Sequence, residues 1–350
     1  MGDGADRLSN GVAGLIAMTA TFALAIAPAP AQEAETFYKG RTLSLIVSSD
    51  AGGGFDTYTR TLGRHIARHI PGTPKIVVQN MPGAGSLTAL NYISNIATRD
   101  GTVFSDADST MPFYTLFEGA NSRFDPLKLN WIGSISSQLG VCIAWHASSF
   151  KTLDDAMARP MKLGATGTAG WRFTLPRLYN IVAGSKFEVI LGYNATQIFL
   201  AMERGETDGA CVTYDTLLAT KSDLLRQNKL TILAQFGLQP AAGLEQVPLA
   251  LDRIADPDDR AAMELILSQQ LTGRPYVAPP DVPAPRLQAL RAAFDATMSD
   301  GEFRADAEKR LLVIDPMTSD KMRALLDKAY AARPETVARA RALMARASRK

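Results

Sequence analysis

The chain is poor in the residues from which metal centres, disulfide scaffolds and catalytic triads are built. It has only 2 cysteines and 3 histidines among 350 residues, which excludes a disulfide scaffold and a four-cysteine zinc site. Its 37 basic and 35 acidic residues nearly cancel, so the charge gives no reason to expect nucleic acid as a partner. Only one apolar run approaches the length that crosses a bilayer, which excludes a membrane protein with several spans.

The common catalytic and nucleotide-binding motifs are also missing. The sequence contains no G-x-x-x-x-G-K-[ST], no G-x-G-x-x-G and no G-x-S-x-G pattern, so it offers no phosphate cradle, dinucleotide loop or nucleophile elbow. Residues 148–151 match S-x-x-K without the accompanying K-T-G. His65 and His69 are one helical turn apart but lack an H-E-x-x-H pattern, so we interpret them as a packed or solvated pair. We therefore expect no enzyme activity, no metal and no cofactor.

The N-terminal segment has the organisation of an export signal. Residues 12–27 are apolar, but this run is shorter than the roughly 20 residues that span a bilayer. Ala29, Pro30 and Ala31 follow as a small-x-small cleavage site, which predicts a signal peptide over residues 1–31 and a periplasmic protein. The region before the run holds one arginine and two aspartates and is not clearly basic, so an uncleaved anchor remains the alternative.

The rest of the chain alternates strands with helices. Apolar strands at 43–48, 75–79 and 102–105 enclose helical patterns at 56–70 and 86–96. This order predicts a parallel sheet with right-handed crossovers. A second α/β unit follows, with predicted strands at 141–145, 162–166, 187–191, 210–214 and 230–236, and residues 257–347 are mostly helical.

Four glycine-containing loops separate predicted strands from predicted helices. Ligands of open α/β sheets bind at this carboxyl edge, where helix N-termini offer unpaired N–H groups and a positive dipole end. Glycine allows the backbone to approach a ligand closely. We therefore predict an anion site, although each loop alone would be explained as a tight turn. The expected anchors are the backbone near Gly53, Gly54, Gly83, Gly85, Gly167 and Gly170 and the hydroxyls of Ser86, Thr168 and Thr196.

Cys142 and Cys211 both lie on predicted strands of the second unit. A periplasmic disulfide requires that these strands be neighbours, with Cα atoms within about 7 Å. Two buried thiols that pack as small hydrophobic groups are the alternative. The sequence leaves both open.

Two of the glycine loops belong to longer patterns. LSLIVSSDAGGGFD at 43–56 and VVQNMPGAG at 77–85 resemble the receptors of tripartite tricarboxylate transporters, the TctC or Bug-type extracytoplasmic solute receptors. Further matches cover nearly all of the chain after residue 31, at 100–101, 124–127, 162–167, 205–209 and 273–283.

This resemblance implies an α/β protein with a type II periplasmic-binding-protein fold, in which two doubly wound lobes are joined by two crossing strands. Residues 36–138 with 237–350 would form lobe one, and residues 139–236 would form lobe two. The implied function is to capture a small organic anion, a carboxylate, between the lobes and to deliver it to the membrane permease subunits of a tripartite transporter. The receptor would be monomeric.

The resemblance also implies which residues bind the ligand, largely through main-chain N–H groups. In lobe one they are Ala51, Gly52, Gly53, Gly54, Phe55, Asp56, Gly83, Ala84, Gly85 and Ser86. In lobe two they are Thr166, Gly167, Thr168, Gly170, Tyr193, Asn194, Thr196 and Asp215.

The chain departs from the family pattern at several of these positions. Asp50 would repel a carboxylate unless it points away. Phe55 replaces a small polar residue, and residues 192–195 lack the lysine of the usual Y-K-G. These changes disfavour a citrate-like ligand and predict an aromatic wall from Phe55, Trp171 and Tyr193, although the same rings would also suit an interdomain core.

Two other functions stay open at this stage. The first is a receptor for an ABC importer or a sensor pathway. The second is a periplasmic hydrolase or transferase on the same fold, against which the scarcity of histidine and the backbone-based site both argue.

Overall fold

The computed structural model describes residue 1 and residues 30–118, 123–166 and 171–349. Most of the predicted signal peptide, residues 2–29, lies outside the described residues, and helix α1 (Pro30–Tyr38) begins the described fold. Among the described helices, none is both long and apolar enough to cross a membrane.

The first lobe is built on a six-stranded sheet in the order β11-β4-β10-β3-β1-β2. Strands β1 (Thr42–Val47), β2 (Lys75–Asn80) and β3 (Val103–Asp106) run parallel. Helices α2 (Gly54–His65) and α3 (Leu87–Asn95) connect them, which confirms the predicted β-α-β-α-β order. The other three strands are antiparallel additions that the sequence analysis did not predict, namely β4 (Asn130–Ser134), β10 (Pro275–Ala278) and β11 (Met317–Thr318).

Periodicity alone predicted how α2 and the short 3-10 helix η1 (Ile66–His69) pack on this sheet, although the single helix expected over 56–70 is α2 followed by η1. Tyr58, Leu62, Ile66 and Ile70 recur at helical spacing, and all four are buried against the first lobe. On another face, His65 and His69 bind Asp306 and Asp300, at 3.0 and 2.9 Å from their Nε2 atoms. These carboxylates belong to the segment of α11 (Gly301–Lys309), so the histidines join two helices of one lobe.

The second lobe is built on a five-stranded sheet in the order β7-β6-β8-β5-β9. Its strands are β5 (Gly140–Trp145), β6 (Met161–Ala165), β7 (Phe187–Leu191), β8 (Gly209–Thr213) and β9 (Leu230–Phe236). Strand β6 runs parallel to β7 and β8, whereas β5 is antiparallel to both β8 and β9. Helices α5 (Leu153–Ala158), α6 (Trp171–Ala183), α7 (Ala195–Glu203) and α8 (Tyr214–Arg226) complete the lobe.

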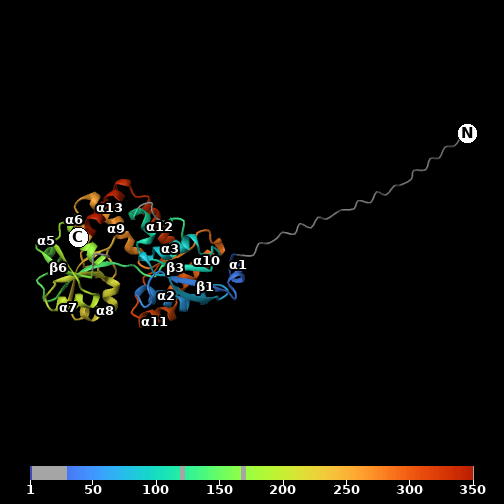
Figure 1. The fold of residues 1–350 in the computed structure, drawn as a ribbon, viewed down its shortest axis with the longest axis horizontal. Coiled ribbons are helices and arrows are strands. Elements are labelled where there is room, and N and C mark those ends of the chain that lie inside the picture. Colours follow the sequence, from blue (N-terminus) through green and yellow to red (C-terminus); the bar gives the residue numbers. More distant parts are fainter. Residues whose placement is uncertain (2–29, 119–122, 167–170, 350) are drawn as a thin grey trace.

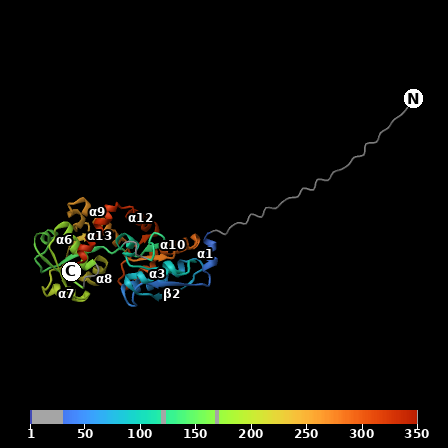
Figure 2. The same cartoon turned by 45° about the horizontal axis from the view of Figure 1, so that its top comes forward.

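The two lobes lie side by side, with β1, β3, α2 and α3 in one and β6, α5, α7 and α8 in the other (Figure 1). The chain passes from β4 to β5 between the lobes and returns after β9. The last helix, α13 (Pro334–Ser348), packs against both α9 (Pro257–Ser268) and α6. Figure 2 shows α13 close to α6 in the turned view as well, so the C-terminal helix contributes to the side of the second lobe. The remaining helices are α4 (Tyr114–Glu118), α10 (Ala284–Ser299) and α12 (Ser319–Tyr330).

The two cysteines form a disulfide. Cys142 on β5 lies directly opposite Cys211 on β8, with the Cα atoms 4.0 Å apart. Both residues are buried in the second lobe. Of the two alternatives that the sequence left open, the structure shows the cross-link.

Candidate functional site

The loop between β1 and α2 presents backbone groups at the carboxyl edge of the first sheet. Residues 51–54 are exposed, and Gly53 caps α2 without a side-chain hydrogen bond. The N–H groups of the first turn of α2 therefore lack the side-chain acceptor that usually occupies a helix start. Asp50, whose charge would oppose an anion, is also exposed.

The carboxylate of Asp56 stabilises this loop. Its carboxylate accepts hydrogen bonds of 2.9 Å each from the Gly52 N–H, Arg60 Nε and Asn80 Nδ2. Burial raises the pKa of Asp56, but the hydrogen bonds from Arg60, Gly52 and Asn80 outweigh it and hold the pKa below its usual value. Since Asn80 ends β2, Asp56 couples the first glycine loop to the start of the second.

The second loop adopts a backbone that few sequences tolerate. Four consecutive residues have positive φ, at 141° for Gly83, 45° for Ala84, 60° for Gly85 and 79° for Ser86. A Cβ atom at Gly83 would collide with the hydroxyl of Thr88. Such strained backbone tends to be kept at binding sites, where it aims peptide groups at a ligand.

Ser86 holds the loops of the first lobe together. Its hydroxyl donates to Ser48 Oγ over 2.8 Å and accepts from the Asp108 N–H over 3.0 Å. The side chain is buried, so it supports the three loops that follow β1, β2 and β3. Ala84 and Gly85, in contrast, are exposed beside it.

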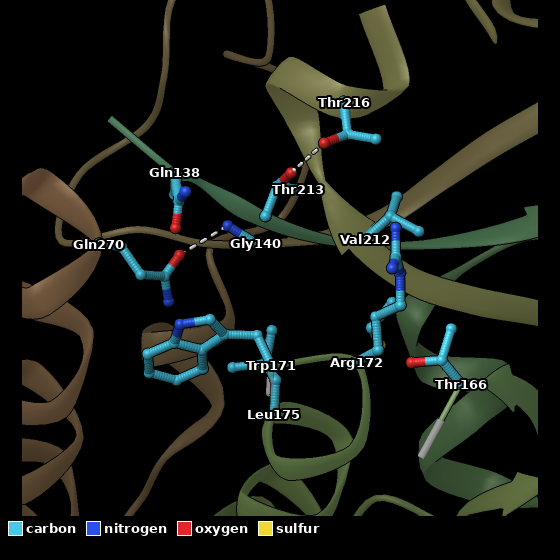
Figure 3. A pocket seen from close by; sticks show the side chains of 11 residues that line it. Gln138, Gly140, Thr166, Trp171, Arg172, Leu175, Val212, Thr213, Thr216 and Gln270 are labelled. Carbon is cyan, nitrogen blue, oxygen red and sulfur yellow. Dashed lines mark hydrogen bonds between the residues drawn. The ribbon is translucent and has the colours of Figure 1, made fainter. Parts of the chain in front are cut away.

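A cavity of about 220 Å³ lies at the carboxyl ends of β6 and β8 of the second lobe and is bordered by residues 138 and 270 of the first (Figure 3); it is here called cavity A. Its described lining residues are Gln138, Gly140, Thr166, Trp171, Arg172, Leu175, Cys211, Val212, Thr213, Thr216 and Gln270. None of these is acidic. Thr213 Oγ1 donates to Thr216 Oγ1 over 2.8 Å, and Gln270 Oε1 accepts the Gly140 N–H over 2.6 Å.

Arg172 is the only cation among the described residues that line cavity A. In Figure 3 its side chain extends toward Val212, away from the Trp171 ring, which lies near Gln270. Burial lowers the pKa of the Arg172 guanidinium, and its Nε atom has no hydrogen-bond partner. Across the described ranges no carboxylate forms an ion pair with Arg172.

A second space, cavity B, lies between the lobes and measures about 630 Å³. Tyr214, Asp215 and Leu218 of α8 line it from the second lobe, and residues 313 and 315–317 line it from the first. Gln270 borders both cavities.

Three further predicted residues sit at the start of α7. Asn194 Oδ1 accepts the N–H groups of Thr196 and Gln197, over 3.0 and 2.9 Å, and so caps the helix. The Tyr193 hydroxyl donates to Glu206 over 3.4 Å. The N–H of Thr196 is therefore already satisfied within the turn. Gly167, Thr168 and Gly170 lie outside the described residues.

Arg274 is a charged residue of the cleft that the sequence analysis did not select. It precedes β10, and its guanidinium lies 4.1 Å from the ring centre of Tyr58 and 5.1 Å from that of Phe55. Its Nη2 lies 3.6 Å from Asp215 Oδ2 on the opposite lobe. Phe55 therefore lies under a cation of its own chain, and its part in an aromatic wall of the site stays a prediction.

Comparisons with known proteins agree with this architecture. No protein-family model matches the chain. A UPF0065 protein of Cupriavidus necator, from the gbd 5' region, is 29% identical over 244 residues, which span 67% of this chain and 71% of that protein.

Three solved structures share the fold. A TctC solute-binding protein from Polaromonas has a TM-score of 0.68 and 19% identity over 88% of this chain and 99% of its own. MatC from Rhodopseudomonas palustris, with bound malate, has a TM-score of 0.55 and 16% identity over 87% of this chain and 99% of its own. The periplasmic binding protein BugD has a TM-score of 0.55 and 16% identity over 89% of this chain and 98% of its own. The resemblance drawn from the glycine loops is confirmed: the chain is similar in sequence to a UPF0065 protein and shares the two-lobe α/β fold of the TctC and Bug solute-binding proteins.

Proposed function

We propose that this protein is a periplasmic receptor that binds a small carboxylate between its lobes and delivers it to the permease of a tripartite tricarboxylate-type transporter. The observation that carries the proposal is Arg172 in cavity A. The side chain is half-buried and its Nε atom is closed to solvent without a partner. A desolvated cation is costly unless an anion neutralises it. The described lining of cavity A supplies no such anion.

A ligand carboxylate would neutralise the Arg172 guanidinium in cavity A. It would form charge-assisted hydrogen bonds with the guanidinium, which are shorter and stronger than neutral ones. The Gln270 amide nitrogen, which has no partner, and the nearby Thr213 and Thr216 hydroxyls add donors within the same cavity. The malate bound in the similarly folded MatC fits this chemistry.

The first lobe would provide a second set of donors. We assign them to the backbone of residues 51–55, of which 51–54 are exposed, and to the exposed backbone of Gly83, Ala84 and Gly85, held in place by Asp56 and Ser86. The two lobes would close on the ligand by a hinge at the crossing segments, with α13 staying on α6 of the second lobe. Enclosure removes water and strengthens each charged contact.

A ligand screen with matched variants tests the binding. Purified protein is melted in the presence of mono-, di- and tricarboxylates, amino acids, sulfonates, neutral sugars and cations. A carboxylate at 100 times its dissociation constant should raise the free energy of unfolding by about 2.7 kcal/mol. Arg172→Gln should lose this response, while Arg226→Gln on the exposed side of α8 should keep it. Stabilisation by a sugar or a cation, and by no anion, would show that the ligand class is wrong.

The transport partner requires its own experiment. Deletion of the permease genes should abolish uptake of the ligand by whole cells, while the receptor still accumulates in the periplasmic extract. Gene neighbours that encode a large and a small membrane subunit would support the tripartite system. A neighbouring ATPase gene would point to an ABC importer instead.

A further inference from the structure

The outer edge of the second sheet is left open at strand β7. This strand is the last one on its side of the sheet, next to β6. The opposite edge, at β9, is covered, because Gln235 bridges to Leu249 and its N–H donates to the Pro248 C=O. Among the described residues, no strand pairs with β7 on its outer side. Proteins usually protect such an edge, since its free N–H and C=O groups can pair with a strand of another chain.

Asn180 of α6 takes the place of a neighbouring strand for one residue of β7. Its Nδ2 donates to the Phe187 C=O over 2.8 Å, and its Oδ1 accepts the Phe187 N–H over 2.9 Å. Both main-chain groups of Phe187 therefore point away from β6. In a parallel strand, the main-chain groups of alternate residues point to the same side, so those of Val189 and Leu191 also face outward. The C=O of Lys186 accepts an N–H of β6, which fits this alternation.

A cavity of about 360 Å³, here called cavity C, lies beside this open edge. Its described lining residues come from α6, β7 and α13, which lies close to α6 in Figure 2. They are Arg177, Asn180, Ile181, Phe187, Val189 and Arg346. Val189 is half-buried, and Leu191 is 42% exposed. These two outward-facing residues are apolar, and neither is the lysine or proline with which sheets commonly block edge pairing.

Two arginines give cavity C a positive charge that the described chain does not balance. None of the described lining residues is acidic, and no described carboxylate forms an ion pair with Arg177 or Arg346. Arg177 is held in place by the Phe173 ring, 4.8 Å from its guanidinium, and by the Arg349 C=O, which accepts from its Nη2 over 2.6 Å. Guanidinium groups bind carboxylates through charge-assisted hydrogen bonds. This edge therefore suits an extended partner with an acidic side chain.

We propose that β7 is the edge on which the membrane permease docks, through an extended permease segment that carries an acidic side chain. The segment pairs with the outward N–H and C=O groups of Val189, and its carboxylate binds Arg177 and Arg346 in cavity C. Strand addition of this kind takes its affinity from main-chain hydrogen bonds and its specificity from pockets for side chains. This inference rests on the proposed function, since it takes the partner to be a permease.

Charge argues against a second copy of this chain as the occupant. Pairing of two β7 edges about a twofold axis places the same surface on both sides of the interface. It would bring together both arginines of each copy, although cavity C has no acidic residue among its described lining. Like charges placed together at an interface are unfavourable and suppress such a pairing.

Site-specific photo-cross-linking in whole cells tests where the permease docks. Benzoylphenylalanine is placed at Leu191 and, as a control, at Ile96, which is 74% exposed at the end of α3 in the first lobe. Illumination should join position 191, but not position 96, to an epitope-tagged permease subunit. The tag identifies the adduct, so capture of an unrelated protein does not count as support.

Matched variants test the two contacts separately. Val189→Pro removes the outward N–H, and an edge strand tolerates proline where that N–H has no partner in the sheet. Val189→Thr keeps the N–H and the β-branched shape and is the control. Arg346→Glu reverses a charge of cavity C, and Arg226→Glu on the exposed side of α8 is its control.

The readout is the initial rate at which cells take up the carboxylate that gives the largest melting response. Val189→Pro and Arg346→Glu should each lower this rate by about tenfold, while the two controls should stay within about twofold of the unaltered protein. All four variants should keep the melting response itself, because cavities A and C share no described lining residue.

The outcomes separate this inference from the proposed function. Unchanged uptake in Val189→Pro and Arg346→Glu, or no permease adduct at Leu191, would overturn the docking edge and leave the carboxylate receptor intact, provided that uptake still needs the permease genes. Loss of the melting response in these two variants would also overturn it, since the edge would then act on ligand binding. An adduct between two receptor chains would show that a second copy occupies the edge. If deletion of the permease genes leaves uptake unchanged, both proposals fail.

Discussion

The disulfide between Cys142 and Cys211 should supply a large part of the stability of the second lobe. The two residues are 69 positions apart, and the bond joins neighbouring antiparallel strands. A cross-link restricts the unfolded chain, and the chain-entropy relation gives about 4 kcal/mol for a loop of this length. The free energy of unfolding of the double variant Cys142→Ala, Cys211→Ala should therefore fall by about that amount.

Urea denaturation followed by circular dichroism measures this difference. Because both sulfur atoms are buried, the unaltered protein should be reduced in urea and then assayed in reductant, where its midpoint should approach that of the double variant. The double variant itself should not respond to reductant. A loss below about 1 kcal/mol would contradict the reasoning, and it would mean that the two cysteines pack as thiols.

The remaining predictions concern the loops and the pH dependence. Gly83→Ala should lower the free energy of unfolding by about 3 kcal/mol, because it adds backbone strain and a collision with Thr88. The control Gly184→Ala, at φ 72° with no atom close to the added Cβ, should lower it by only about 1 kcal/mol. Equal urea midpoints for these two variants would contradict the strain argument. The Phe303 N–H, with Arg68 and His69, holds the pKa of Asp300 well below its usual value, and hydrogen bonds led by His65 outweigh burial and lower the pKa of Asp306. Since the folded pKa of each is depressed, their stabilisation is complete above the unfolded pKa of about 4 and is lost as the pH falls below it. The urea midpoint should therefore drop between pH 6 and pH 3, by less in Asp300→Asn; an equal drop in both proteins would refute the assignment.

The local sequence pattern was sufficient to predict the parallel part of the first lobe. The spacing of Tyr58, Leu62, Ile66 and Ile70 defines a helix face, and three apolar strands with two such helices define a parallel unit. Because parallel strands end at the same edge, the glycine loops also come together. The short strands β10 and β11 were missed because their place depends on pairing with distant segments, and a run of two to four residues has no period to detect.

The local sequence pattern could not identify the charged residues of the site. Arg274 is one of 37 basic residues, and its partners come from α2 and from α8 of the opposite lobe. Only the assembled fold brings them within reach. Arg172 could not be selected for the same reason, since the lack of an acidic residue among the described lining residues is a property of cavity A and not of its own helix. The register of β5 against β8, which decides the disulfide, is likewise a matter of long-range pairing.

A crystal structure of the protein with a bound dicarboxylate is the most direct test of the account. It should show ligand density between the lobes, with one carboxylate within hydrogen-bond distance of the Arg172 guanidinium and with backbone N–H groups of the glycine loops facing the ligand. Ligand density away from Arg172, with its Nε atom still unpaired, would contradict the claim that this half-buried cation draws a carboxylate into the cleft.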